Sequence, residues 1–176
     1  MSVFQYLTEE HALLLRLVGR LERGSADPDE RAAARETRNI LLVLLKALES
    51  HERLERLVFD PAPKPHELSV AERRALLVVE GQHRMLAELR EEAVALLRDG
   101  PRDGSAPLRA LVLRLATLLR RHFQDEEREL WPSFNAHADR STLGRLDRQV
   151  RSHVRAMEGE LSRYWAEVAD YLTGDR

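Results

Sequence analysis

Apolar residues recur at alternating steps of three and four along four long segments of this chain, and stretches rich in Pro and Gly separate the segments. This spacing places the apolar side chains on one face of an α-helix. The segments run over about residues 3–23, 28–59, 69–98 and 107–130. Ser2 with Gln5, and Ser69 with Glu72, have the spacing of a capping box at a helix start. Long helices joined by short loops predict an all-α protein, an up-down-up-down four-helix bundle.

A fifth segment, from about residue 141 to residue 172, carries a long apolar stripe of its own, interleaved with Arg and Glu. We expect residues 1–138 to form the bundle and residues 139–176 to form an additional C-terminal helix. Such a helix can pack on the open side of the bundle, or it can pair with its copy in a second chain. A homodimer through this helix is therefore one of two expectations.

The composition limits the partners and the chemistry of the chain. With 28 basic and 30 acidic residues the net charge is −2, so no global positive field attracts nucleic acid or anionic lipid. No uninterrupted run of about 18 apolar residues and no secretion signal occur, so we expect a cytoplasmic protein that does not span a membrane. The absence of cysteine excludes disulfides, iron–sulfur clusters and thiolate zinc sites. Any metal must be held by nitrogen and oxygen.

The apolar face of each of the four bundle segments is interrupted by residues that can bind metal. The interruptions are His11 in the first segment, His51 and Glu55 in the second, His83 in the third, and His122 and Glu126 in the fourth. Residues four apart lie on adjacent turns of one helix face. All six side chains should therefore point toward the axis of the bundle.

The order of these residues repeats within the chain. His11 is followed 40 residues later by His51, and His83 is followed 39 residues later by His122. Each second histidine is followed four residues later by a glutamate. The two halves therefore look like copies of one helical hairpin. In an antiparallel bundle built from two similar halves, the six groups can meet in one layer.

A single histidine on an apolar face is more often a core residue satisfied by a hydrogen bond than a metal ligand. Two glutamates on such faces are different, because a carboxylate without water costs several kcal/mol unless it is paired, protonated or bound to metal. No Lys or Arg lies on these faces. We therefore predict that the layer binds metal, with a metal-free bundle as the alternative.

The number and type of these ligands indicate the metal. Six ligands exceed the four of a closed tetrahedral zinc site, and four imidazoles are too rich in nitrogen for calcium or magnesium. Two transition ions fit better, each with two histidines and with the two carboxylates spanning both ions. Iron or manganese suits this mixture of ligands, and manganese or zinc are the substitutes we expect for iron.

Four motifs carry a resemblance to a known family. They are Glu9-Glu10-His11, His51-Glu52-Arg53-Leu54-Glu55, Gln82-His83, and His122-Phe123-Gln124-Asp125-Glu126-Glu127 ahead of Leu130-Trp131-Pro132. Together they resemble the hemerythrin-like family, or cation-binding HHE domain, over about residues 3–135. The resemblance implies a four-helix bundle around a non-haem di-iron centre with a bridging oxide or hydroxide. It further implies that His11 and His51 bind one iron, that His83 and His122 bind the other, and that Glu55 and Glu126 bridge them.

The resemblance also bears on function. Oxygen-carrying hemerythrins have a second histidine one turn away on the third helix, whereas Val79 and Ala87 stand one turn either side of His83 here. The resemblance therefore implies open iron positions and a reactive or sensing centre that binds O2, NO or peroxide for sensing, storage or detoxification. The alternative is a helical interaction module in which the metal is structural or iron-responsive. Whether the chain is an enzyme stays open, since no electron supply is evident in it.

Two further residues are candidates for the surroundings of the centre. Glu52, beside His51, can act as a hydrogen-bond acceptor near the metal or as an occasional ligand. His153 can supply a fifth nitrogen if the C-terminal helix approaches the metal layer. We expect other residues to lie outside the centre, namely Glu127 in solvent, His66 and His137 at the surface, and Tyr6, Tyr164 and Trp165 in packing contacts.

Overall fold

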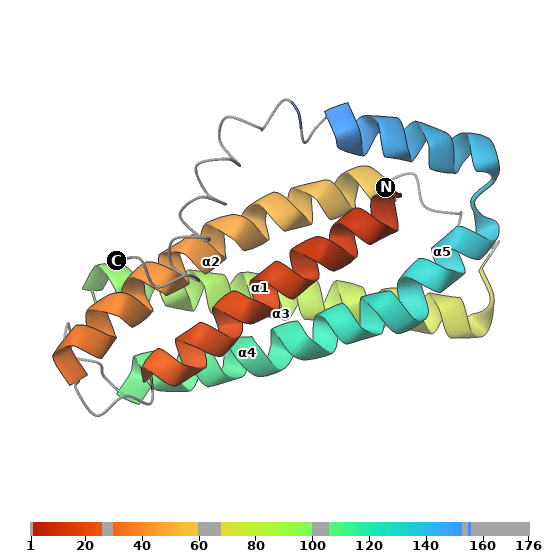
Figure 1. Cartoon of the computed structure of the whole chain (residues 1–176). Coiled ribbons are helices and arrows are strands. Elements are labelled where there is room, and N and C mark those ends of the chain that lie inside the picture. Colours follow the sequence, from red (N-terminus) through yellow and green to blue (C-terminus); the bar gives the residue numbers. More distant parts are fainter. Residues whose placement is uncertain (1, 26–29, 60–67, 100–105, 153–154, 156–176) are drawn as a thin grey trace.

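The computed structural model of the chain describes residues 2–25, 30–59, 68–99, 106–152 and 155. Its four long helices are α1 (Val3–Ser25), α2 (Glu30–Phe59), α3 (Val70–Asp99) and α4 (Ala106–Asp125). Successive helices run in opposite directions (Figure 1), and no strand occurs among the described residues. The prediction of an all-α, up-down-up-down four-helix bundle is therefore confirmed. Within the same residues, no helix is long and apolar enough to cross a membrane.

Hydrogen bonds of the predicted capping boxes hold the starts of two helices. The backbone N–H of Gln5 donates to Ser2 Oγ at 3.2 Å, and that of Glu72 donates to Ser69 Oγ at 3.2 Å. In the second box, Glu72 Oε2 accepts from the backbone N–H of Ser69 at 2.6 Å. These bonds satisfy N–H groups that have no partner within the helix. They explain why α1 and α3 begin within one residue of the predicted positions.

The fourth helix does not end where the sequence predicts, ahead of Trp131-Pro132. The chain continues through a π-helical turn, η2 (Glu126–Leu130), into a further α-helix, α5 (Trp131–His137). The backbone N–H of Trp131 donates to the carbonyl oxygen of Glu126, five residues earlier. Pro132 lies in the first turn of α5, where a missing N–H is tolerated. The proline therefore starts a new stretch of helix and does not stop the old one.

Only the first part of the predicted fifth segment lies within the described residues. Residues 140–152 are helical, which confirms the expected start near residue 141. Leu146 and Val150 are buried against the bundle, and the backbone N–H of Val3 donates to Asp147 Oδ1 at 2.9 Å. Residues 153, 154 and 156–176 lie outside the described residues, and so do the candidates His66, His153, Tyr164 and Trp165.

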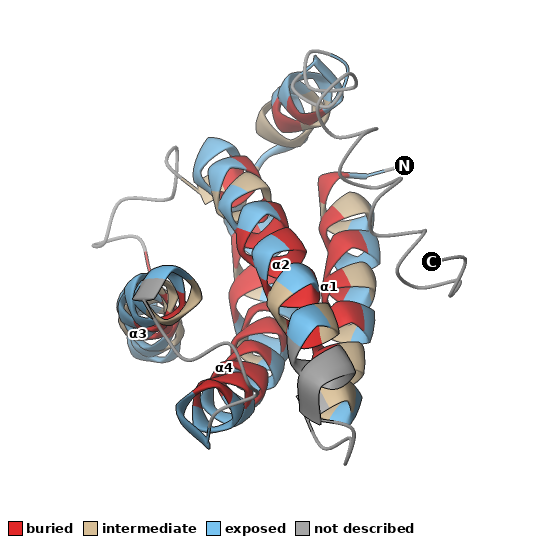
Figure 2. Ribbon diagram, turned by 90° about the vertical axis from the view of Figure 1, so that its left-hand side faces the viewer, coloured by how far each residue is buried: buried red, intermediate tan, exposed pale blue. Residues whose placement is uncertain are grey.

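The four helices turn their buried faces toward one another (Figure 2). One apolar cluster fills the end of the bundle where α1 and α3 finish, and it includes Leu21, Leu44 and Leu111. A second cluster fills the other end, and it includes Leu7, Leu54 and Trp131. Packing is extensive between α1 and α2, between α1 and α4, and between α3 and α4, but sparse between α2 and α3. Buried polar side chains lie between the two clusters.

Candidate metal centre

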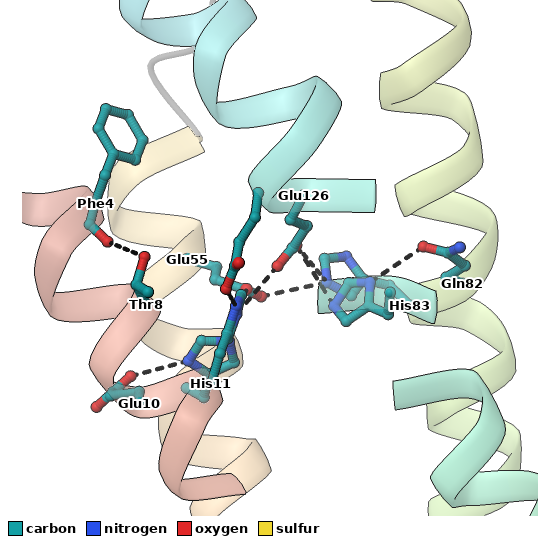
Figure 3. Close-up of polar contacts among 11 residues, drawn as sticks. Phe4, Thr8, Glu10, His11, Glu55, Gln82, His83 and Glu126 are labelled. Atoms are coloured by element: carbon teal, nitrogen blue, oxygen red, sulfur yellow. Dashed lines mark hydrogen bonds and ion pairs between the residues drawn. The ribbon is translucent and has the colours of Figure 1, made fainter. Parts of the chain in front are cut away.

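The six predicted residues meet in this polar layer (Figure 3). They come from five elements: His11 from α1, His51 and Glu55 from α2, His83 from α3, His122 from α4, and Glu126 from η2. All are at most 2% exposed except His83, which is 35% exposed. The apolar periodicity of each helix explains this convergence, because the residues occupy positions on the inward face.

The six side chains form two groups of four that share the two glutamates. His11 and His51 lie with Glu55 and Glu126, and the same glutamates lie with His83 and His122. In each group the four ligand atoms lie within 4.8 Å of one another. The histidine rings pair edge to face in both groups, with centroids 4.7 Å apart in the first and 4.6 Å apart in the second. The two halves of the chain thus contribute nearly equivalent histidine pairs.

Each glutamate turns one oxygen toward each histidine pair. Glu55 Oε1 lies 2.9 Å from His51 Nε2, and Glu55 Oε2 lies 3.3 Å from His83 Nε2. Glu126 Oε2 lies 3.3 Å from His11 Nε2, and Glu126 Oε1 lies 3.4 Å from His122 Nε2. A carboxylate that faces two imidazole pairs in this way has the geometry to bridge two cations.

Among the described residues, the layer contains buried polar atoms whose contacts to neighbouring imidazoles and carboxylates lack hydrogen-bond geometry. They are both carboxylate oxygens of Glu55, both of Glu126, and His83 Nε2. Leaving a buried polar atom without a partner costs about 1–3 kcal/mol, and more when the atom is charged. Nitrogen and oxygen donors without sulfur, gathered around a common point, suit transition cations. The residues present therefore fit metal ions.

Carboxylates position the two imidazoles of the first group from outside the layer. His51 Nδ1 donates to Glu10 Oε2 at 2.9 Å, and His11 Nδ1 donates to Glu127 Oε1 at 2.8 Å. A carboxylate that accepts from Nδ1 orients the ring, so Nε2 is the nitrogen that faces the layer, and the Nε2 atoms of His11 and His51 lie 2.9 Å apart there. Glu127 is exposed to solvent, as expected, at 39%, but its carboxylate also contacts the buried His11 ring, which the sequence did not predict.

An amide takes the same role in the second group. Gln82 Oε1 accepts from His122 Nδ1 at 3.2 Å, and Gln82 Nε2 donates to Asp125 Oδ2 at 2.7 Å. Asp125 also accepts from Arg121 at 2.8 Å, which keeps it ionised and fixes the orientation of the amide. No hydrogen bond to His83 Nδ1 occurs within the described part of the chain. The second group is therefore held less firmly and carries less negative charge around it than the first.

Burial and charge set the protonation of the layer. Burial lowers the pKa of His122 to about 3 and also lowers the pKa of His11. Burial disfavours the charged form of His51 as well, but the carboxylates of Glu55 and Glu10 outweigh it and raise the His51 pKa well above its usual value.

Burial and neighbouring charges also shift the pKa values of the two glutamates, in opposite directions. Burial raises the pKa of both carboxyls, and in Glu126 the charge of Glu55 adds to that effect. For Glu55 the neighbouring imidazoles, His51 first, reverse the effect and hold the pKa well below its usual value. Without a cation the layer must therefore hold protons to balance its charge, and a bound cation takes their place.

Glu10 and Gln82 were not predicted as site residues, although both stand in the motifs that carry the family resemblance. Glu10 precedes His11 and bonds His51 on α2, while Gln82 precedes His83 and bonds His122 on α4. The pattern thus repeats in both halves at separations of 41 and 40 residues. This repeat was a usable signal. Helical periodicity alone does not detect this repeat, because both residues lie off the centre of the apolar face.

The other candidates within the described residues lie outside the two groups. The Glu52 carboxylate accepts from Arg90 at 3.0 Å and lies 3.5 Å from Arg56, so it pairs with arginines at the edge of the bundle. His137 is about one-third exposed, as expected for a surface residue, and lies 3.2 Å from Glu72. Tyr6 packs against the second apolar cluster, as expected.

Fold and site together define a class of protein: a four-helix bundle with a histidine and carboxylate layer that can hold metal. The sequence model of the hemerythrin HHE cation-binding domain matches residues 74–174. The chain therefore belongs to the hemerythrin HHE cation-binding family. The match includes His83, His122 and Glu126, whereas His11, His51 and Glu55 precede it and join the site through the fold. No match was found among curated proteins or among solved structures.

Proposed function

We propose that the layer holds two iron ions and binds a small ligand, O2, NO or peroxide, for sensing, storage or detoxification. His11 and His51 would bind one ion, His83 and His122 the other, and Glu55 and Glu126 would bridge the two. The observation that carries this proposal is the pair of buried glutamates whose four oxygens face both histidine pairs and make no hydrogen bond to any described residue. Iron in such a site would supply open coordination positions and a change of redox state.

The small ligand would enter the polar layer beside His83. His83 is 35% exposed, whereas the other three histidines are at most 2% exposed. Val79 and Ala87, one turn either side of His83, offer no donor atom and line a cavity beside it. On the opposite side, the Phe123 ring stacks on His11 with centroids 3.9 Å apart and closes the layer. The chain's own part is thus to orient the imidazoles and to limit the access of water.

Metal analysis with ultraviolet–visible spectroscopy tests this proposal. We expect two irons per chain and a spectral change when the reduced protein meets NO. Glu126→Gln removes one bridging carboxylate and should lose most of the metal, while Glu129→Gln, on the exposed side of the same turn, should keep it. Protein purified without stoichiometric metal, or equal metal content in the two variants, would overturn the proposal.

A structural role for the metal is the second candidate, because the six residues tie together all four helices of the bundle. On this interpretation, metal removal lowers stability but no small ligand alters the spectrum of the loaded protein. The same NO titration therefore separates the two functions. A spectral change supports ligand binding, and an unchanged spectrum of a fully loaded protein supports the structural role.

A further inference from the structure

A cavity of about 440 Å³ opens between α2 and α3, where the two helices pack together least. Its wall includes Glu55 and His83, so it lies directly beside the metal centre. Sites for small organic molecules have volumes of about 300–1,000 Å³. The cavity is therefore far larger than O2, NO or peroxide requires, and the small-ligand function does not explain its size.

The lining changes character along the cavity. At one end the walls are apolar, formed by Phe59, Leu76, Val79 and Leu130. At the other end Arg90 on α3 donates to Glu52 on α2 at 3.0 Å and ties the two helices together. Since α2 and α3 are antiparallel, the metal centre lies between these ends. An occupant of the cavity can therefore contact an apolar compartment at one end and charged side chains along the rim.

Apart from Glu55, which belongs to the metal centre, the charged residues that line the cavity and form its rim are three arginines and two glutamates. Glu52 is already engaged by Arg90 and Arg56. Arg84 makes no ion pair within the described residues and stands next to His83 on the rim. Glu80, the other acidic residue, lies one turn before Arg84 on α3 and, like Arg84, is exposed and lines the cavity. The rim therefore offers a guanidinium with free donors, which suits a carboxylate.

We infer that this cavity binds an organic carboxylate with an apolar body, such as a medium-chain fatty acid. The apolar chain packs against the compartment around Phe59 and Leu76, and the carboxylate pairs with Arg84. Burial of the chain supplies most of the affinity, and the ion pair sets the preference for an anion. This inference goes beyond the proposed function, because the chain's own side chains, not the metal, form the site.

Titration calorimetry on the full chain as purified tests the chemical class. The probes are octanoate, 1-octanol and octylamine, which share a chain length and differ in charge. We expect octanoate to bind most tightly and octylamine most weakly. Failure of all three to bind overturns the cavity as a site, and octylamine binding as tightly as octanoate overturns the assignment of the anion.

Two phenylalanine substitutions place the binding in the cavity. Ala87→Phe fills the space beside His83, and octanoate affinity should fall at least tenfold. Ala110→Phe places the same side chain on the exposed face of α4, away from the cavity, and should leave the affinity unchanged. Circular dichroism confirms that both variants are folded. Equal octanoate binding by the two folded variants contradicts the inference.

Two charge variants on exposed positions test the ion pair with little risk to folding. Arg84→Gln should weaken octanoate binding about two- to fivefold, the range of a partly exposed ion pair. Glu80→Gln should strengthen it by a similar factor, while Arg109→Gln on α4 serves as the control. None of the three should alter the affinity for 1-octanol. Unchanged octanoate affinity in both Arg84→Gln and Glu80→Gln overturns the role of the rim.

Metal content measured in the same samples separates this inference from the proposed function. Stoichiometric iron without octanoate binding overturns the inference and leaves the proposed function intact. Octanoate binding by a protein that takes up no metal overturns the proposed function and supports the inference.

Discussion

At the scale of single residues, hydrogen bonds on the outer nitrogens of three of the four histidines decide how the centre is held. Glu10 and Glu127 accept from the two imidazoles of the first group, while Gln82 accepts from one imidazole of the second. A carboxylate makes an imidazole a stronger donor to a metal than an amide does. We therefore expect the two halves of the centre to differ in affinity, with the first group the tighter.

Glu10→Gln tests this difference. The variant keeps a side chain of the same shape but replaces the carboxylate that accepts from His51. Substitutions of this kind typically cost about 10–100-fold in metal affinity. We expect a loss of about tenfold in chelator competition followed by metal analysis. Glu9→Gln, on the exposed face of α1, is the control and should bind metal as the unaltered chain does. Identical chelator curves for the two variants would show that Glu10 does not position His51.

At the scale of elements, hydrogen bonds at Glu72 connect the start of α3 to α5. Glu72 Oε2 accepts from the backbone N–H of Ser69 at 2.6 Å, and its Oε1 accepts from Ser133 Oγ at 2.9 Å. Hydrogen bonds from Ser69 and Ser133 lower the pKa of the Glu72 carboxyl from 4.5 to about 2. The ionised carboxylate is thus the form that stabilises the fold.

The pH dependence of Glu72→Gln follows from this lowered pKa. The contribution of the carboxylate is complete above about pH 4.5 and is lost as the pH falls toward 2, because in this range the unfolded chain takes up a proton that the folded chain does not. We expect Glu72→Gln to be less stable than the unaltered chain in urea at pH 7, and this difference to shrink below pH 4.5. Glu88→Gln, exposed on the same helix, should show no such trend. A difference independent of pH would refute the assignment.

The π-helical turn η2 brings two consecutive glutamates to one histidine. Glu126 Oε2 lies 3.3 Å from His11 Nε2, and Glu127 Oε1 lies 2.8 Å from His11 Nδ1. A π-helical turn holds one residue more than an α-helical turn, since its hydrogen bonds span five residues and not four. The extra residue widens the helix at the metal centre, where such turns often occur in proteins.

Deletion of Arg128 tests the role of this turn. Removing this exposed residue should convert η2 into regular α-helix without loss of helix content. Glu126 and Glu127 should then no longer reach His11 together, so metal affinity should fall about tenfold. Arg128→Ala keeps the length of the turn and should retain the affinity. Circular dichroism and chelator competition provide the measurements, and an unchanged affinity in the deletion variant would contradict this account.

At the scale of the whole molecule, the polar layer divides the apolar core into two clusters. Within the described chain, the glutamate oxygens of this layer have no hydrogen-bond partner, so the layer weakens the bundle unless cations compensate. Metal that binds only the folded state adds stability in proportion to the logarithm of its concentration over its dissociation constant.

Removal of metal should therefore destabilise the chain. A metal concentration of 100 times the dissociation constant stabilises a protein by about 2.7 kcal/mol, and a chain of this size loses roughly 5–10 °C in Tm when that amount is removed. We expect a drop of at least this size in differential scanning calorimetry after chelation, reversed when iron is restored. The chelated His51→Ala variant gives the comparison, because its Tm should respond little to iron. A Tm independent of metal in the unaltered chain would contradict the prediction.

The sequence by itself determined the helices, their two capping boxes and the six residues of the layer. These features are local: periodicity fixes which face of a helix is buried, and a residue on that face must point at the axis. The fold class and the convergence of the six side chains could therefore be predicted.

Only the tertiary structure decided the contacts that depend on how two helices are placed. Glu10, Gln82 and Glu127 reach histidines on other helices, so their roles follow from the rotation and offset of packed helices and not from their own periodicity. The same holds for the cavity between α2 and α3, which exists because these helices stand apart. The π-helical turn likewise depends on packing. It connects the fourth helix to α5, although the proline in the first turn of α5 predicts the end of a helix at this point.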